Sequence, residues 1–184
     1  TIEVLKTLVD DNKTSLKNNL HPVKINNSYT IKTPKSSYKI EFVNITHSTI
    51  ESAIIALHTK HGVILYANDY KFDNTPVFGD PPNYKRLKEL SKIGVKALIA
   101  DCLYAQDDRK TPSEKIAKGL LEDVLFTTDN KKSGIIITTF SSHIARLKSI
   151  TEFGRRLNRE VIFLGRSLNK YVSAATVINK APFR

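Results

Sequence analysis

The chain has 184 residues, with 29 lysines and arginines against 18 aspartates and glutamates, and so carries a formal net charge of +11 at pH 7. This balance favours a polyanionic partner such as nucleic acid, although a compositional bias toward lysine would also produce it. No apolar run is long enough to span a membrane, no secretory signal is visible, and the single cysteine excludes an internal disulfide.

The first predicted elements are a helix and two β-hairpins. Apolar residues recur at helical spacing over residues 2–9, and a polar stretch with Pro22 follows. The runs after it predict hairpin strands at 28–33 and 38–46, a second pair at 52–59 and 63–68, a helix at 84–93 and a strand at 95–100. The last run is apolar throughout, which is typical of a strand buried on both faces. We therefore expect Cys102, just behind it, to be buried and unreactive.

The pattern changes near residue 110 to alternating helices and strands. Thr111, Pro112 and Glu114 form a predicted capping box, in which Thr111 is the N-cap of a helix. The elements predicted after it are a buried strand at 134–139, a helix at 141–158, a strand at 160–164 and a helix at 169–178. This order indicates a parallel β-α-β unit. We place a domain boundary here, which gives domains at 1–110 and 111–184.

Two polar residues close apolar strands and could share one site. His47 follows the strand at 38–46, and Asp69 follows the strand at 63–68. Imidazole and carboxylate groups suit a divalent metal such as zinc, so the pair is a candidate metal site. A lone histidine at a strand end is more often structural, however, and an aspartate there can be a turn residue. His58 and His61 also lie close in sequence, but they flank an exposed hairpin tip that offers no other ligands.

An ordered series of short motifs sharpens this hypothesis. The motifs are His47-Ser48-x-x-x-Ser52, Asn-Asp-Tyr-Lys-Phe-Asp-x-Thr-Pro-Val at 68–77, Leu-Ile-Ala-Asp-Cys at 98–102, Thr-Pro-Ser-Glu at 111–114, Thr-Thr-Phe-Ser-Ser-His-Ile-Ala-Arg at 138–146 and Gly-Arg-Ser at 165–167. From about Asn27 to the C-terminus, this series resembles the ribonuclease J family of the metallo-β-lactamase/β-CASP superfamily, in its archaeal form. Each motif is weak alone, and their order and spacing carry the resemblance.

The resemblance implies an α/β fold, with part of a metallo-β-lactamase αββα sandwich at 1–110 and the first half of a β-CASP domain, with a parallel sheet, at 111–184. It also implies a cytoplasmic hydrolase with two Zn²⁺ per complete active site, which cleaves RNA phosphodiester bonds as a 5′-to-3′ exonuclease in RNA processing and decay. Endonuclease activity and a homodimer are left open. The alternatives are a β-CASP nuclease of DNA repair or RNA 3′-end processing, and a nucleic-acid-binding module without catalysis.

The same resemblance implies roles for three strand-end residues. Asp69 would bridge the two zinc ions, His47 would bind one, and Asp101 would orient a metal-ligating histidine, so Asp69 and Asp101 are the catalytic candidates. A strand-end cap is the alternative for Asp101. The family's His-x-His-x-Asp-His motif and its two later histidine segments have no counterpart here, and of the five histidines only His47 matches. We therefore expect an internal fragment that by itself is inactive and holds zinc weakly.

Five residues are candidates for binding RNA phosphates. Ser141 and Ser142 stand at the start of a predicted helix, where free N–H groups attract anions, and Arg146 lies one turn further along. Arg166 and Ser167 follow the end of a predicted strand, a position where α/β sheets often bind ligands. A simple N-cap explains the two serines equally well.

Two other basic features keep two interpretations each. Lys71 could line the path of the RNA, although a solvated lysine is the simpler explanation. The Arg-Arg-x-x-Arg cluster at 155–159 could be an RNA-facing patch or an interface patch.

Overall fold

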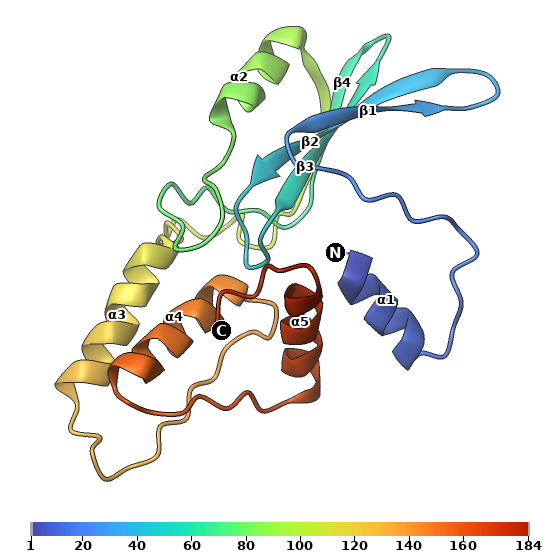
Figure 1. The fold of residues 1–184 in the computed structure, drawn as a ribbon. Helices are drawn as coiled ribbons and strands as arrows, with labels where there is room; N and C mark the ends of the chain where they lie inside the picture. The colour runs from blue at the N-terminus through green and yellow to red at the C-terminus, as the bar shows by residue number, and fades with distance from the viewer. Residues whose placement is uncertain (1, 184) are drawn as a thin grey trace. The chain divides into compact units, whose positions relative to one another are not determined.

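The computed structural model describes residues 2–183, and the chain divides into two compact units (Figure 1). Residues 23–113 form the first, called here the sheet unit. Residues 2–22 and 114–183 form the second, called here the helical unit. The change of unit at residue 113 lies close to the boundary expected at 110. Residues 2–22, however, group with the C-terminal part of the chain and not with the sheet.

The sheet unit contains a five-stranded sheet with the order β1-β2-β3-β4-β5 (Figure 1). Its elements are β1 (Asn27–Lys32), β2 (Ser37–Ile45), β3 (Ser52–Thr59), β4 (Gly62–Ala67), α2 (Tyr84–Ile93) and β5 (Val95–Ala100). The pairs β1–β2, β2–β3 and β3–β4 are antiparallel, whereas β4–β5 is parallel and is connected through α2. Both predicted hairpins, the helix and the last strand are therefore confirmed.

One face of this sheet is packed against α2. Inward-facing residues of three strands form two adjacent apolar clusters, and Leu90 of α2 completes the first of them. The clusters consist of Val43, Ala56, Val63 and Leu90, and of Ile45, Ile54 and Ala67. Within each strand these residues are two or four positions apart, as expected when every second side chain of a strand faces the same side. Asn83 caps α2 by accepting a hydrogen bond from the Arg86 N–H at 3.0 Å.

The tight turn between β3 and β4 requires glycine at position 62. Gly62 has a φ of +125°, a conformation that L side chains rarely adopt. A Cβ atom at this position would also lie 2.8 Å from the carbonyl oxygen of Gly94, at the start of β5. The neighbouring Val63 N–H donates to that same oxygen at 2.9 Å. The turn thus fixes where β5 enters the sheet.

The expectation that β5 is buried on both faces is wrong. β5 lies at the edge of the sheet and pairs only with β4, and the side chain of Leu98 is 62% exposed. Cys102, expected to be buried behind this strand, is exposed as well. A continuous apolar run predicts a strand, but burial depends on which elements pack against it, and these do not cover β5 within residues 2–183.

The helical unit contains four helices. They are α1 (Ile2–Asp11), α3 (Glu114–Thr127), α4 (Ile144–Arg156) and α5 (Arg166–Val177). α3 packs on α4, where Phe126 meets the fully buried ring of Phe153 edge-on at a centroid distance of 5.9 Å. α1 packs on α5, and Lys170 forms an ion pair with Asp11. No helix among residues 2–183 is long and apolar enough to cross a membrane.

Two predicted strands of this unit are not formed. Residues 134–139 and 160–164 have no regular secondary structure and no strand pairing, and Ile136 is 93% exposed. The predicted parallel β-α-β unit is therefore absent from the described residues. An extended segment becomes a strand only when a neighbour completes its hydrogen-bond ladder. The α/β class itself is confirmed, because residues 2–183 contain a mixed sheet with one parallel pair together with five helices.

The helix starts in this unit also differ from the sequence expectation. α3 begins at Glu114, so Thr111 is not its N-cap, and Glu114 is buried in an ion pair with Arg146 and does not close a capping box. α4 begins at Ile144 with His143 in the N-cap position. Ser141, expected to be that cap, instead lies in the preceding turn.

Candidate active-site edge

Three strands of the sheet unit end at the same edge of the sheet. Because β3 is antiparallel to both β2 and β4, and β5 is parallel to β4, the strands β2, β4 and β5 all run in one direction. His47 lies two residues after β2, Asp69 two residues after β4, and Asp101 directly after β5. The shared edge expected for His47 and Asp69 is therefore confirmed. The segments 46–48, 68–71 and 101–102 are called here the strand-end edge.

A backbone bridge brings two of these segments together. Thr46 and Lys71 form an isolated antiparallel bridge, in which the Lys71 N–H donates to the Thr46 carbonyl at 2.8 Å. The Thr46 hydroxyl donates to the Lys71 carbonyl and accepts from the Asp73 N–H at 3.0 Å. Since the pairing is antiparallel, residues before Lys71 run alongside residues after Thr46, which places the Asp69 segment beside His47 and Ser48.

Asp73 fixes the loop that carries Asp69. Its side chain is buried, accepts a hydrogen bond from the Thr75 N–H at 3.0 Å and lies 3.5 Å from the Lys71 ammonium group. Asp73 was predicted only as part of the motif at 68–77, without this role. The spacing Asp-x-Thr, typical of a turn in which a carboxylate accepts a backbone N–H two residues on, was the available signal. Lys71 is thus half-buried against Asp73, and the simpler expectation of a solvated lysine is wrong.

The side chains of His47 and Asp69 are both exposed at this edge. The Nδ1 atom of His47 lies 3.2 Å from the Ser48 hydroxyl, which leaves Nε2 available. Imidazole and carboxylate are donors that zinc accepts, so the pair fits the metal in kind. It falls short in number, because a zinc site takes three or four protein ligands. Within residues 2–183, no group of three or more His, Cys, Asp or Glu side chains could hold a metal ion.

Asp101 extends the ladder between β4 and β5 and then caps a turn. Its N–H donates to the Ala67 carbonyl at 3.3 Å, and its Oδ1 accepts a hydrogen bond from the Leu103 N–H at 3.0 Å. This geometry is that of the strand-end cap, the alternative left open for this residue. The carboxylate remains exposed and retains a second oxygen for another donor.

The candidates for phosphate binding lie in the helical unit at two separate helix starts. Ser141 and Ser142 are half-buried in the turn before α4. The guanidinium of Arg146 is bound by both carboxylate oxygens of Glu114, at 2.9 Å for the Nη2–Oε2 contact, and this raises the pKa of Arg146. Arg166 and Ser167 are exposed and lie within the first turn of α5. The sequence had predicted that they precede this helix.

Two arginines of the predicted basic patch have internal roles. Arg156 forms an ion pair with Glu122, and its guanidinium lies 4.4 Å from the centre of the Phe126 ring. Arg159 donates to the Ser133 carbonyl at 2.8 Å and to the Asn130 carbonyl, which ties the segment after α3 to the end of α4. These two cations are thus partly neutralised or engaged within the unit, and neither an RNA-facing nor an interface role follows from the cluster alone.

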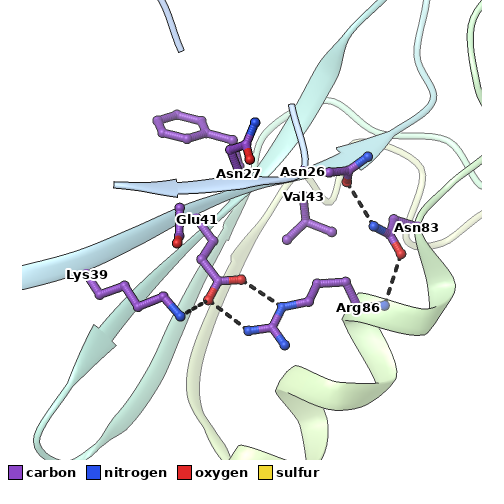
Figure 2. A pocket seen from close by; sticks show the side chains of 9 residues that line it. Asn26, Asn27, Lys39, Glu41, Val43, Asn83 and Arg86 are labelled. Carbon is purple, nitrogen blue, oxygen red and sulfur yellow. Dashed lines mark hydrogen bonds and ion pairs between the residues drawn. The ribbon is translucent and has the colours of Figure 1, made fainter. Parts of the chain in front are cut away.

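A buried carboxylate on β2 forms a charged cluster that sequence reasoning missed. Glu41 accepts hydrogen bonds from the Arg86 Nε at 2.7 Å and Nη2 at 2.8 Å, and its Oε1 lies 2.9 Å from the Lys39 ammonium group (Figure 2). The Nε2 of His58 lies 2.8 Å from the same oxygen. The Arg86 hydrogen bonds, with a smaller contribution from Lys39, lower the pKa of Glu41 to about 2. The cluster borders a polar pocket whose other side chains include Asn26 and Asn83.

His58 therefore has a partner in the sheet, and its role is to bind Glu41 across β2 and β3. Lys39 and Glu41 are two residues apart on β2, and His58 lies opposite Lys39 on β3. The sequence shows the spacing of Lys39 and Glu41, but it does not reveal that His58 and Arg86 contact the same carboxylate. Arg86 reaches the same carboxylate from α2, so the cluster ties the helix to the sheet. Such a pairing is expected where a carboxylate is buried, because an unpaired buried charge is costly.

Comparison with known proteins places the chain in a family. The sequence model described as "Ribonuclease J, beta-CASP domain" matches residues 132–180. A ribonuclease J of Pyrococcus abyssi is 52% identical over 136 residues, which are 74% of this chain and 30% of that protein. A ribonuclease J of Methanocaldococcus jannaschii is 41% identical over 184 residues, which are 100% of this chain and 40% of that protein. One from Helicobacter pylori is 35% identical over 136 residues, which are 74% of this chain and 19% of that protein.

The archaeal matches agree with the archaeal form of the motifs at 47–52 and 68–77. The chain spans between 30% and 40% of the length of the two archaeal relatives. The chain therefore belongs to the ribonuclease J family.

Proposed function

We propose that this chain supplies the strand-end edge of the active site of a zinc-dependent ribonuclease. The observation that carries the proposal is the common direction of β2, β4 and β5, which brings the ends bearing His47, Asp69 and Asp101 to one edge. Similarity to proteins named Ribonuclease J supports RNA as the substrate. The net charge of +11 supports a polyanionic substrate as well.

Each strand-end residue has a distinct part in this proposal. Asp69 and His47 bind metal through a carboxylate and an imidazole, and the Thr46–Lys71 bridge holds their segments together. Asp101 positions a histidine from elsewhere in the protein through its second carboxylate oxygen. Two bound zinc ions would supply an activated water and stabilise the oxygens of an in-line displacement at phosphorus.

The finer features of the proposal are those expected for a member of the ribonuclease J family. They are hydrolysis in the 5′-to-3′ direction, action in RNA processing and decay, and a place in the cytoplasm. Endonuclease activity and a homodimer also belong to this proposal. Ser141, Ser142, Arg146, Arg166 and Ser167 are proposed to contact phosphates, and for Arg146 this requires that its pairing with Glu114 leaves Nη1 free to donate.

A chimeric enzyme tests this proposal directly. The segment of the Methanocaldococcus jannaschii ribonuclease J that aligns with all 184 residues would be replaced by this chain. The chimera should degrade 5′-labelled RNA faster than DNA of the same sequence. Asp69→Asn should abolish degradation while leaving RNA binding nearly unchanged, because the charge-driven part of binding rests on basic groups elsewhere.

Asp80→Asn is the matched control, since Asp80 is an exposed aspartate of the same unit that lies outside the strand-end edge. It should retain full activity. A folded chimera that keeps degrading RNA with Asp69→Asn would contradict the role of the edge, and one that prefers DNA would favour the DNA-repair alternative.

A second candidate function rests on the ligand count. With no group of three metal-binding side chains within residues 2–183, the 184-residue chain alone would act as an RNA-binding module without catalysis. RNA cleavage by the purified chain, inhibited by a chelator, would rule this out.

A further inference from the structure

Next to the strand-end edge lies a pair of exposed, nearly parallel aromatic rings. The rings of Phe72 and Tyr84 have centroids 5.9 Å apart and an interplanar angle of 19°. Tyr70 meets the ring of Phe72 edge-on at 5.5 Å. The side chain of Phe72 is 54% exposed and that of Tyr84 is 37% exposed. Phe72 and Tyr84 are called here the aromatic platform.

The backbone on both sides holds these rings in place. Phe72 lies between Lys71, which is paired with Thr46, and the buried Asp73. Tyr84 is the first residue of α2, and its hydroxyl donates to the Asn74 side-chain oxygen at 2.6 Å. The platform is therefore a built feature of the loop and the helix start. Two aromatic rings held at a fixed position offer a preformed apolar face to a ligand, which saves the cost of ordering them on binding.

The position and charge of the platform favour RNA as that ligand. Phe72 follows Lys71, and Lys71 is bridged to the residue before His47, so the platform adjoins the strand-end edge within the same unit. Exposed Lys85 and Lys88 follow Tyr84 on α2. Aromatic faces with basic side chains around them are the usual surface for single-stranded nucleic acid, because every base has a π-face to stack and a phosphate to neutralise.

We propose that Phe72 and Tyr84 form a stacking platform for a base of single-stranded RNA beside the strand-end edge. This rests on the proposed function, since it takes RNA as the ligand and adds how the strand is held. Stacking is tolerant of sequence, so the platform would select an unpaired strand and not a particular base. A duplex, whose bases are already stacked, would gain nothing from it.

The test measures binding of the 184-residue chain to fluorescent single-stranded RNA of about eight nucleotides, a length within the site sizes of such surfaces. Each oligonucleotide has a counterpart with abasic sugars, which keeps the phosphates and removes the bases. Phe72→Leu and Tyr84→Leu should each weaken RNA binding about tenfold, within the effect of about 1–3 kcal/mol measured per stacked base. Binding of the abasic strand should stay unchanged.

Conservative and control variants separate stacking from folding. Phe72→Tyr keeps the ring and should bind like the unaltered chain. Tyr84→Phe keeps the ring but loses its hydrogen bond to Asn74, so it should weaken binding clearly less than Tyr84→Leu. Tyr38→Leu removes an exposed ring on the β1–β2 hairpin of the same unit and should have no effect. A 2-aminopurine base in the RNA should lose fluorescence on binding, and Phe72→Leu should restore much of it.

The outcomes distinguish this proposal from the proposed function. If the unaltered chain binds RNA but Phe72→Leu binds it equally well, or if the abasic strand is weakened to the same degree, the platform is contradicted and the proposed function stands. If the unaltered chain binds no RNA at low salt, both are contradicted. A third outcome would assign the rings to protein docking. In that case the chain would form a stable complex with a protein partner, and Phe72→Leu would abolish this complex without any loss of RNA binding.

Discussion

The sheet unit and the helical unit differ in how their apolar segments are used. In the sheet unit, every predicted strand has a hydrogen-bonded neighbouring strand, and side chains such as Ile45 are almost fully buried. In the helical unit, the apolar segments 134–139 and 160–164 found no partner and stay exposed. An apolar run therefore becomes a strand only where a neighbouring strand completes its hydrogen bonds, and neither composition nor an intervening helix such as α4 ensures this.

The largest expected effect tests whether the helical unit nevertheless has a core of its own. Phe153 is fully buried between Phe126 and the side chains of Lys118 and Arg156. Phe153→Ala should lower the free energy of unfolding by about 3–5 kcal/mol, as for other large buried aromatics. Hydrogen exchange at the amides of α4 would measure it. Phe126→Ala, at a more exposed position, should cost clearly less, and equal losses would contradict a core centred on Phe153.

A charge-based prediction concerns the core of the sheet unit. Glu41→Gln should lower the free energy of unfolding at pH 7 by about 2–3 kcal/mol, because it leaves the Lys39 and Arg86 charges without their buried partner. Glu89→Gln removes only the exposed second partner of Arg86 and should cost about 1 kcal/mol or less. Urea unfolding of the two variants would compare them.

The same carboxylate predicts a pH dependence. The pKa of Glu41 is lowered to about 2 in the folded chain, below its ordinary value of 4.5. A lowered pKa means that the stabilisation is complete above the ordinary pKa and is lost as the pH falls from about 5 toward 2. The free energy of unfolding should therefore fall over that range by up to about 3 kcal/mol, at about 1.4 kcal/mol per pKa unit. Glu41→Gln should flatten this fall, and an unchanged slope would contradict the buried pairing.

A smaller effect concerns two helical glycines. A Cβ atom at Gly154 of α4 would lie 2.3 Å from a methyl group of Val161, so Gly154→Ala should destabilise the helical unit by about 1–3 kcal/mol. A Cβ atom at Gly119 of α3 would have no other atom within 4 Å, so Gly119→Ala should stabilise the helical unit by about 0.5–1 kcal/mol. Thermal unfolding would give both signs. Two shifts of the same sign would mean that α4 and the segment after it are not packed as described.

The smallest effect sharpens the comparison between the units. Ile136→Ser changes a residue of a predicted strand that is 93% exposed, and it should shift the free energy of unfolding by less than about 0.5 kcal/mol. The matched change Ile45→Ser, at 2% exposure in β2, should cost several kcal/mol. Equal effects of the two substitutions would show that residues 134–139 are buried as a strand after all.

The sequence predicted the sheet unit well because its signals are local. Apolar alternation and turn residues each act within a few residues, so the strands, the turns between them and α2 could be placed correctly. The common edge of His47 and Asp69 followed from the strand ends. The role of Asp73 rests on Thr75 and Lys71 within two residues, so its Asp-x-Thr spacing could have indicated it. The Glu41 cluster could not be predicted, because Arg86 lies 45 residues away from Glu41. The predicted capping box failed for the same reason, since Glu114 is drawn to Arg146, 32 residues away.

The most direct test of the strand-end edge as a metal site is a zinc titration of the 184-residue chain, followed by amide chemical shifts. Chemical-shift changes should appear together at residues 46–48, 68–70 and 101–103, and they should vanish in Asp69→Asn. They should require millimolar zinc, because two direct protein ligands hold the ion only weakly. Zinc should also be lost on dialysis against a weak chelator. Tight, stoichiometric zinc, or shifts centred instead on His58 and His61, would contradict the assignment of this edge as the metal-binding part of the site.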